Sequence, residues 1–249
     1  MTSQKTDLSI VIPCFNESKN VTIVLEQLTA IIKKQPYTVE VIVIDGNSTD
    51  NTPKELQAIY KFSSKDSFKL ILSKTRGGYG GDIMRALSTA KGEVLAWTHA
   101  DLQTDPSDVF KAYDLYLELS KKDKKIFIKG KRKNRRFMEV FFTFGMQIIA
   151  WLVFKIYLSD INAQPKIFPK KFYNNYLKAD YPRDFSLDLF VLYQAAMNGY
   201  AIKTIPVYFK KRINGEAKGG GGSWSMRIKL IKRTFKYIFE LKRKFDIQV

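Results

Sequence analysis

The stretch VEVIVIDGNSTDNTP, residues 39–53, decides the fold of this chain. It opens on β-branched and apolar side chains, and a continuous run of this kind is typical of a strand that is covered on both faces of its sheet. Polar residues follow at once, and Pro53 is tolerated in the first turn of a helix, so a helix is predicted to begin near Asp50 or Asn51. Strand, polar loop and helix in this order form the repeating unit of an α/β fold.

The same unit recurs on either side of this stretch. We predict strands over residues 8–15, 39–46, 69–75 and 93–101, and helices over residues 18–34, 52–61 and 78–90. Because this alternation implies right-handed crossovers, the sheet is predicted to be largely parallel. Ligands of such sheets bind beyond the carboxyl ends of the strands. This chain has polar clusters there, at residues 16–17, 45–50, 74–82 and 99–105.

The second half of the chain is less regular. Strands are predicted over residues 126–130 and 201–210, and the four glycines at 219–222 are predicted to form a flexible joint. Between the two strands, residues 140–154 carry no charge. Fifteen residues are short of the roughly 20 that span a bilayer, so we expect a buried or interfacial helix rather than a transmembrane one.

Length and composition fit one α/β domain of ordinary size, since 249 residues can bury a sizeable core. The single cysteine, Cys14, excludes an internal disulfide and favours a reducing compartment. The N-terminus lacks the pattern of a signal peptide. We therefore expect a cytoplasmic protein.

The formal net charge of +18 is unevenly placed. Residues 1–120 hold 13 Lys/Arg against 15 Asp/Glu, whereas residues 121–249 hold 29 against 9. The second half is therefore predicted to meet an anionic partner. Nucleic acid, anionic lipid and a phosphorylated substrate are all compatible with this positive charge, and the charge alone does not distinguish among them.

Residues 224–249 form the clearest amphipathic segment of the chain. Apolar side chains recur at intervals of three and four from Trp224 to Phe245, and lysines and arginines surround this stripe. One interpretation is a terminal helix docked on the protein's own core. Another is a helix that lies on anionic lipid, because aromatic and aliphatic side chains opposite a dense basic face are typical of membrane-surface helices. Nucleic-acid binding is a third.

The segment WTHADLQTDP, residues 97–106, carries the chemistry expected of a metal site. If the preceding strand stays extended, His99, Asp101 and Gln103 lie on one side of it. A carboxylate, an amide oxygen and an imidazole suit Mg²⁺ or Mn²⁺, and the histidine favours Mn²⁺. The alternative is a polar turn at the strand end, in which Asp105 caps the next helix ahead of Pro106.

Three segments in this order carry a family resemblance: IPCFNE at residues 12–17, VIDGNSTDNT at 43–52 and ADLQTDP at 100–106. Together they resemble glycosyltransferase family 2, and more narrowly its dolichol-phosphate mannose synthase-like branch. The resemblance implies an α/β GT-A fold and an inverting, metal-dependent enzyme. Such an enzyme moves a sugar from a GDP- or UDP-linked donor to a polyprenyl phosphate. The resemblance also implies a catalytic domain over residues 1–223, followed by the basic helix of residues 224–249. Within the domain, residues 1–120 form the nucleotide-sugar half and residues 121–223 the acceptor half.

Carried over by position, the resemblance also implies site residues. Those beside the nucleotide sugar are Pro13, Asn16, Glu17, Asp45, Gly78, Gly80, Arg85, Ala100 and Asp101. The family's usual Asp-x-Asp metal motif has His99 in its first position here, so the implied metal ligands are Asp101, Gln103 and His99. Asp45 lacks the second acid that the family usually places next to it, because Gly46 and Asn47 follow.

The acceptor side is implied in the same way. The basic residues expected to bind the acceptor phosphate are Arg132, Arg135, Arg212 and Lys218. The implied catalytic residues are Asp101, Arg132, Asp188 and Arg212. Asp188 either orients one of these arginines, acts as a base toward a hydroxyl acceptor, or is an ordinary solvated carboxylate at a helix start.

Two other functions stay open at this point. One is a transferase of the same family that uses a hydroxyl acceptor on a glycolipid or surface polysaccharide. The other is a basic nucleic-acid-binding protein, which would leave the acidic cluster at residues 99–105 unexplained, so we expect no nucleic-acid partner. The resemblance implies attachment to the cytoplasmic membrane face, and the apolar stretch at 140–154 could also serve a homo-oligomer.

Overall fold

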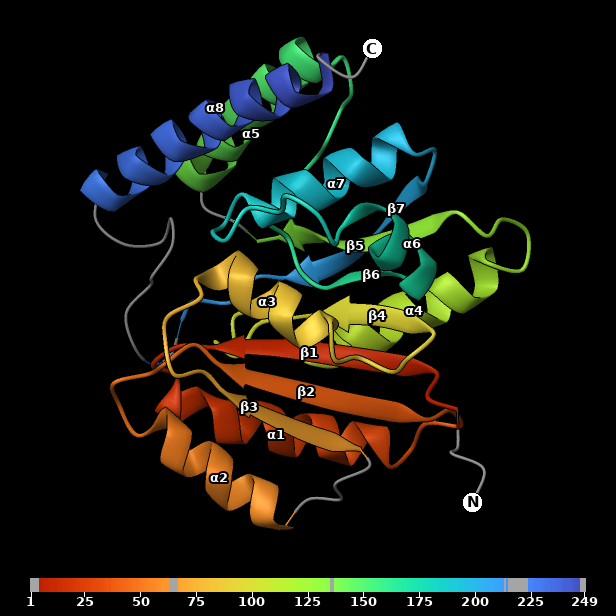
Figure 1. Ribbon diagram of the computed structural model, residues 1–249, viewed down its shortest axis with the longest axis vertical. Helices are drawn as coiled ribbons and strands as arrows, with labels where there is room; N and C mark the ends of the chain where they lie inside the picture. The colour runs from red at the N-terminus through yellow and green to blue at the C-terminus, as the bar shows by residue number, and fades with distance from the viewer. Residues whose placement is uncertain (1–4, 63–66, 135–136, 213, 215–223, 247–249) are drawn as a thin grey trace.

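The computed structural model describes residues 5–62, 67–134, 137–212, 214 and 224–246 (Figure 1). Its centre is a seven-stranded sheet with the strand order β3-β2-β1-β4-β6-β5-β7. All neighbouring strands run parallel except β6, which is antiparallel to both β4 and β5. The strands are β1 (Leu8–Cys14), β2 (Val39–Asp45), β3 (Phe68–Leu72), β4 (Val94–Trp97), β5 (Ile126–Lys133), β6 (Lys166–Pro169) and β7 (Ala201–Tyr208).

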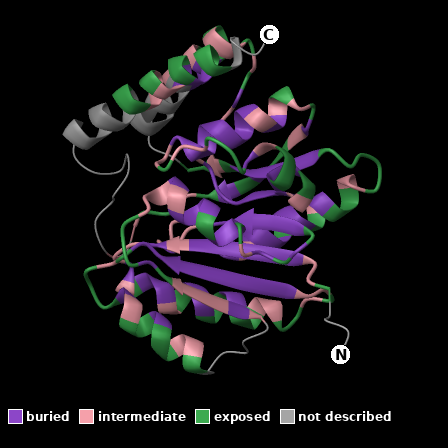
Figure 2. Cartoon of the chain, viewed as in Figure 1, coloured by how far each residue is buried: buried purple, intermediate pink, exposed green. Residues whose placement is uncertain are grey.

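Helices cover both faces of the sheet. One face packs on α1 (Ser18–Ile32), α2 (Thr52–Phe62) and α4 (Asp108–Leu119). The other packs on α3 (Tyr79–Leu87), α6 (Lys170–Tyr176) and α7 (Leu187–Met197). The strands between these layers are buried along most of their length (Figure 2). A sheet covered on both sides explains the continuous apolar runs of β1 and β2, whose side chains enter two separate cores.

Two more helices, α5 (Phe137–Phe154) and α8 (Trp224–Asp246), lie side by side beyond α7 (Figure 1). Ile238 and Leu241 of α8 are buried, as is Ala150 of α5, so the amphipathic stripe docks on the protein's own core at these positions. Ion pairs from Arg233 to Asp184 (3.0 Å) and from Lys244 to Asp180 (3.8 Å) tie α8 to the loop before α7. In the described ranges, every helix is too short or too polar to cross a bilayer.

The predicted strands and helices of residues 1–120 are confirmed within a few residues, with one consequential exception. The strand predicted over residues 93–101 ends at Trp97, and Leu102 has a left-handed backbone (φ 58°). The extended geometry expected through Gln103 is therefore wrong, since residues 98–99 have no regular structure and residues 100–104 form bends. In the second half, β6, α6 and α7 were not predicted.

Candidate active site

The loops that follow β1 and β2 are locked to each other. Asn16 adopts a left-handed backbone (φ 53°), and its side-chain Oδ1 accepts a hydrogen bond from the Thr49 amide (2.8 Å). The backbone N–H of Asn16 in turn donates to Ser48 Oγ (2.8 Å). Asparagine tolerates this conformation better than most residues, so it suits a tight turn at a strand end. The predicted nucleoside-side residues Pro13 and Asn16 therefore lie at the carboxyl edge of the sheet.

Asp45, at the end of β2, is buried, and both of its carboxylate oxygens accept hydrogen bonds from Ser48. A second carboxylate, Asp82 of α3, lies against Gly46: a Cβ on this glycine would come within 2.6 Å of Asp82 Oδ2. Burial raises the pKa of Asp82 to about 6, the charge of Arg85 opposes the rise, and Asp45 adds to it. Asp82 belongs to the polar cluster predicted at residues 74–82, but its place beside Gly46 was not predicted, because no local pattern shows that α3 returns to β2.

The glycine turn before α3 accommodates a neighbouring backbone. A Cβ on Gly78 would lie 2.5 Å from the Arg183 carbonyl oxygen, and Gly78 has the positive φ (77°) that favours glycine. The amides of Gly80 and Gly81 both donate to that same carbonyl, at 2.9 and 3.2 Å. The backbone packed on this turn is thus the 182–184 segment, and contact of Gly78 and Gly80 with a nucleotide remains a prediction.

Of the predicted metal ligands, His99 and Asp101 lie close together, whereas the side chain of Gln103 bonds to a backbone carbonyl. His99 Nδ1 is 3.9 Å from Asp101 Oδ2. Gln103 donates its backbone amide to Asp101 Oδ1 (3.1 Å), while its side-chain nitrogen donates to the Lys210 carbonyl (3.3 Å). Ala100, between the first two, is buried. Within the described ranges, no group of three His, Cys, Asp or Glu side chains is placed so that it could bind one metal ion. One carboxylate and one imidazole fit a divalent cation that takes its other ligands from a bound substrate.

Arg212, after β7, reaches this pair from the second half of the chain. Its guanidinium forms an ion pair with Glu17, and its Nε donates to the Asn214 carbonyl (2.8 Å). Its NH1 lies 3.9 Å from Asp101 Oδ2. Glu17, which was predicted beside the nucleoside, is therefore a direct partner of the predicted acceptor arginine.

Arg132, at the end of β5, is held by Asp160. The carboxylate accepts hydrogen bonds from the Arg132 backbone amide (2.7 Å) and from its Nε (2.9 Å) and NH2. Burial alone would raise the pKa of Asp160, but these hydrogen bonds and the charge of Arg132 lower it below its ordinary value. Arg135 and Lys218, the other predicted phosphate-binding residues, lie outside the described residues.

Among the described residues, Asp188 pairs with neither Arg132 nor Arg212, and it is not solvated, so both of those interpretations are wrong. It is 1% exposed and forms an ion pair with Lys166, which is fully buried in β6. Gln164 Nε2 donates to Asp188 Oδ1 (3.0 Å), and Tyr79 Oη donates to Asp188 Oδ2 (3.3 Å). None of Tyr79, Gln164 and Lys166 was predicted, since they come from three elements that only the fold brings together.

A second buried lysine, Lys129 of β5, lies near Lys166. Its ammonium donates to the carbonyls of Gly130 and Ser159, both at 2.9 Å. Burial, followed by the charge of Lys166, lowers the pKa of Lys129 to about 7. This part of the core therefore holds two buried lysines close to the predicted acceptor arginine Arg132.

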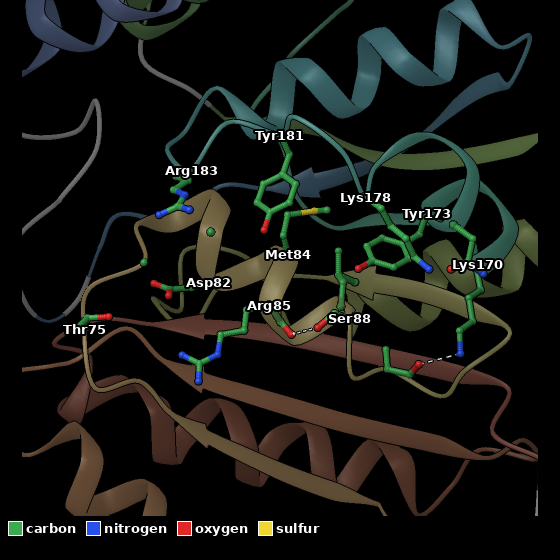
Figure 3. A pocket seen from close by; sticks show the side chains of 15 residues that line it. Thr75, Asp82, Met84, Arg85, Ser88, Lys170, Tyr173, Lys178, Tyr181 and Arg183 are labelled. Carbon is green, nitrogen blue, oxygen red and sulfur yellow. Dashed lines mark hydrogen bonds between the residues drawn. The ribbon is translucent and has the colours of Figure 1, made fainter.

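Arg85 was predicted beside the nucleotide sugar. It lines a hollow of about 650 Å³ between α3, α6 and the 178–183 segment, together with Lys170, Lys178 and Arg183 (Figure 3). Its NH1 lies 3.3 Å from Ser73 Oγ. Neither His99, Asp101 nor Arg212 lines this hollow. Contact of Arg85 with a nucleotide sugar therefore remains a prediction.

A mostly parallel sheet with ligand-binding side chains at its carboxyl edge is the architecture of nucleotide-binding α/β proteins. Residues 9–162 match the model of the family described as Glycosyl transferase family 2. The match covers more than half of the chain, and the chain belongs to this family.

Two curated relatives illustrate the range of similarity. Dodecaprenyl-phosphate galacturonate synthase of Rhizobium johnstonii is 30% identical over 135 residues, which cover 53% of this chain and 38% of the relative. Dolichyl-phosphate beta-glucosyltransferase of Dictyostelium discoideum is 20% identical over 245 residues, covering 93% of this chain and 75% of the relative. The chain thus spans well under half of the first relative's length.

Solved structures support the expected fold. Glucosyl-3-phosphoglycerate synthase from Mycobacterium tuberculosis, in complex with Mn²⁺, UDP-glucose and phosphoglyceric acid, superposes with a TM-score of 0.72 at 14% identity. The superposition covers 95% of this chain and 80% of that one. A mannosyltransferase from Pyrobaculum calidifontis, in complex with GDP-Man and Mn²⁺, superposes with a TM-score of 0.60 at 20% identity, covering 86% and 59%. At these identities the likeness concerns the fold, and the expected GT-A fold is confirmed.

Proposed function

We propose that this chain is an inverting glycosyltransferase that moves a sugar from a GDP- or UDP-linked donor to a polyprenyl phosphate at the cytoplasmic membrane face. One observation carries the proposal. Asp101 Oδ2 lies 3.9 Å from the imidazole of His99 and also 3.9 Å from the guanidinium of Arg212. A cation site and a phosphate-binding side chain are therefore neighbours at the carboxyl edge of the sheet.

On the donor side, Asp101 and His99 would hold Mn²⁺ or Mg²⁺, and the backbone amide of Gln103 orients the Asp101 carboxylate. When bound, such a cation neutralises the charge that grows on a departing nucleoside diphosphate. Asp45 and Asn16 fix the two loops against which the nucleoside would bind. The proposal thus places the nucleoside beyond β1 and β2, and the scissile bond near Asp101.

On the acceptor side, Arg212 would bind the phosphate, because a guanidinium fork matches phosphate geometry. A phosphate oxygen of the acceptor attacks the anomeric carbon of the sugar. The bond from that carbon to the diphosphate breaks, and its electron pair leaves with the nucleoside diphosphate. A phosphate monoester is largely dianionic at neutral pH, so this attack needs no general base. The burial of Asp188 agrees with such a mechanism, since this carboxylate cannot reach a solvent-side hydroxyl.

The names of the relatives support a lipid acceptor. The Rhizobium and Dictyostelium proteins are named for dodecaprenyl phosphate and dolichyl phosphate, and a third relative, from Pseudomonas fluorescens, is named for undecaprenyl phosphate. The third is 30% identical over 102 residues, which cover 30% of its length.

The acceptor class is tested by transfer of labelled sugar. We expect the purified chain, with Mn²⁺ or Mg²⁺, to move label from one member of a panel of UDP- and GDP-sugars onto a short-chain polyprenyl phosphate. The matching polyprenol without its phosphate should accept no label, because Arg212 would then lack its ligand. Label found only on hydroxyl acceptors would refute the phosphate acceptor and favour a glycolipid or polysaccharide acceptor.

The membrane surface is proposed from α5 and α8. Trp151 and Leu152 of α5 are 49% and 51% exposed, and Phe239 of α8 is 53% exposed. Exposed lysines and arginines accompany them on α8, at positions 232, 233, 236, 242, 243 and 244. Apolar side chains beside a basic helix face suit the surface of an anionic bilayer.

Charge reversal tests this surface. Replacing Lys232, Lys242 and Arg243 by glutamate is expected to weaken binding to phosphatidylglycerol-containing vesicles by at least about 100-fold, since each basic residue near such a surface contributes about 1 kcal/mol and the new carboxylates add repulsion. Vesicle sedimentation measures the effect. The matched control reverses the exposed Lys121, Lys122 and Lys124 and should leave binding almost unchanged. Equal binding by both variants would contradict the proposed surface.

A further inference from the structure

We propose that Tyr79 is a positioning residue that holds His99 with its proton on Nε2, which leaves Nδ1 as the atom that faces Asp101 and binds the metal. The inference rests on the metal site of the proposed function. It also predicts which nitrogen of His99 carries the proton in the metal-free protein, and this can be tested without sugar transfer.

Tyr79 Oη lies where three polar side chains meet. It is 3.1 Å from Gln164 Nε2, 3.3 Å from Asp188 Oδ2 and 3.4 Å from His99 Nε2. Its ring is fixed by stacking on Phe185, with ring centroids 4.6 Å apart and planes 18° apart. Tyr79 thus joins the buried Asp188 cluster to the histidine of the metal motif.

The hydrogen-bond inventory of this cluster assigns each proton. Gln164 Nε2 can only donate, and it donates to Asp188 Oδ1 and to Tyr79 Oη. Lys166 also donates to Asp188 Oδ1. Among the described residues, Tyr79 is the donor to Asp188 Oδ2, and a buried carboxylate oxygen is costly to leave without a donor. The single hydroxyl proton of Tyr79 therefore belongs to Asp188.

This assignment decides the state of His99. A phenol is neutral at physiological pH, so the Tyr79 hydroxyl carries one proton. Because that proton points to Asp188, Tyr79 presents a lone pair to His99. A hydrogen bond between them then requires the proton on His99 Nε2, since a neutral imidazole carries one proton and one lone pair. The Nδ1 atom of His99 is left with its lone pair.

The other side of the ring agrees with this assignment. His99 Nδ1 lies 3.9 Å from Asp101 Oδ2, which is too long for a hydrogen bond. Two lone-pair atoms thus face each other with no proton between them. Ligand bonds to small divalent cations are about 2 Å long, so two ligands of one cation can lie up to about 4 Å apart. An imidazole ligand in this place favours Mn²⁺ over Mg²⁺.

His99 is the only histidine of the chain, which makes the inference directly measurable. In tag-free protein labelled with ¹⁵N-histidine, every imidazole nitrogen signal comes from this residue. We expect long-range ¹H–¹⁵N spectra of the metal-free protein to show a protonated Nε2 and an unprotonated Nδ1. The variant Tyr79→Phe should shift both nitrogen signals, whereas Tyr181→Phe, in the hollow beside α3, should leave them unchanged. A proton on Nδ1, or a Tyr79→Phe spectrum identical to that of the native protein, would overturn the proposal.

Manganese binding provides the second readout. With Mn²⁺ added alone and with UDP or GDP, pulsed EPR should detect a directly bound ¹⁴N nucleus that disappears in His99→Ala. Tyr79→Phe should weaken Mn²⁺ binding about 10-fold, as is usual when the partner of a ligating histidine is lost. Sugar transfer without a bound nitrogen would overturn this inference and leave the proposed function intact. If the nitrogen assignment is as expected but no acceptor receives sugar, the proposed function is overturned and the inference about Tyr79 and His99 stands.

Discussion

Replacing Asp101 by asparagine is expected to lower sugar transfer about 1,000-fold while leaving the fold intact. The amide keeps the size of the side chain and an oxygen that can accept the hydrogen bond from the Gln103 amide. It removes the negative charge that would hold the divalent cation between His99 and the donor. Loss of about 4 kcal/mol of transition-state stabilisation corresponds to this factor. Initial rates with saturating Mn²⁺ measure the effect, and titration of Mn²⁺ should show weakened binding.

The matched control lies in the same loop. Asp105 is exposed, and its carboxylate accepts a hydrogen bond from the Ser107 amide (2.8 Å) at the start of α4. Asp105→Asn should therefore keep nearly full activity, as should Lys121→Ala on the distant surface. If Asp101→Asn and Asp105→Asn were equally active, the metal site would have to lie elsewhere.

Replacing Asp188 by leucine is expected to destabilise the protein by about 3–5 kcal/mol. The change leaves the ammonium of Lys166 without its counter-ion in a site where this side chain has no exposure to water. Removal of one partner of a buried ion pair typically costs this amount, because the remaining charge stays uncompensated. Urea unfolding followed by circular dichroism measures the free energy of unfolding.

The double variant Asp188→Leu with Lys166→Met separates the charge from the packing. It removes both charges, so it should recover most of the lost stability. Glu26→Leu, at an exposed carboxylate of α1, serves as the surface control and should change stability by less than about 0.5 kcal/mol. A double variant as unstable as Asp188→Leu alone would show that packing, rather than an unpaired charge, explains the loss.

The first half of the fold was predictable because burial on both sheet faces leaves a strong local pattern. The apolar runs in β1 and β2, each followed by polar residues, mark strand and loop directly in the sequence. The length of β4 was not predictable, since its end depends on the left-handed turn at Leu102, and leucine gives no signal for such a turn. The expectation of three ligands on one extended strand failed for that reason.

Some residues of the candidate site could likewise be predicted from local motifs, and others could not. The family resemblance named Asp101 and Arg212, although they are far apart in sequence, because each lies in a short motif of its own. No motif contains Gln164 or Lys166. Lys166 stands in a four-residue strand that runs antiparallel to its neighbours, and a lysine normally indicates a solvated position. A lysine beside Ile167 and Phe168 was the one local signal of a buried charge.

The carbonyl of Arg183 has a consequence for how charge is balanced during transfer. Many nucleotide-binding proteins seat a phosphate on free amides at the start of a helix. In this chain the amides of Gly80 and Gly81 already have a partner within the protein, so α3 cannot offer them to an incoming diphosphate. Under the proposed function, side chains and a bound ion would therefore have to hold the leaving group, and transfer would depend on the supply of that ion.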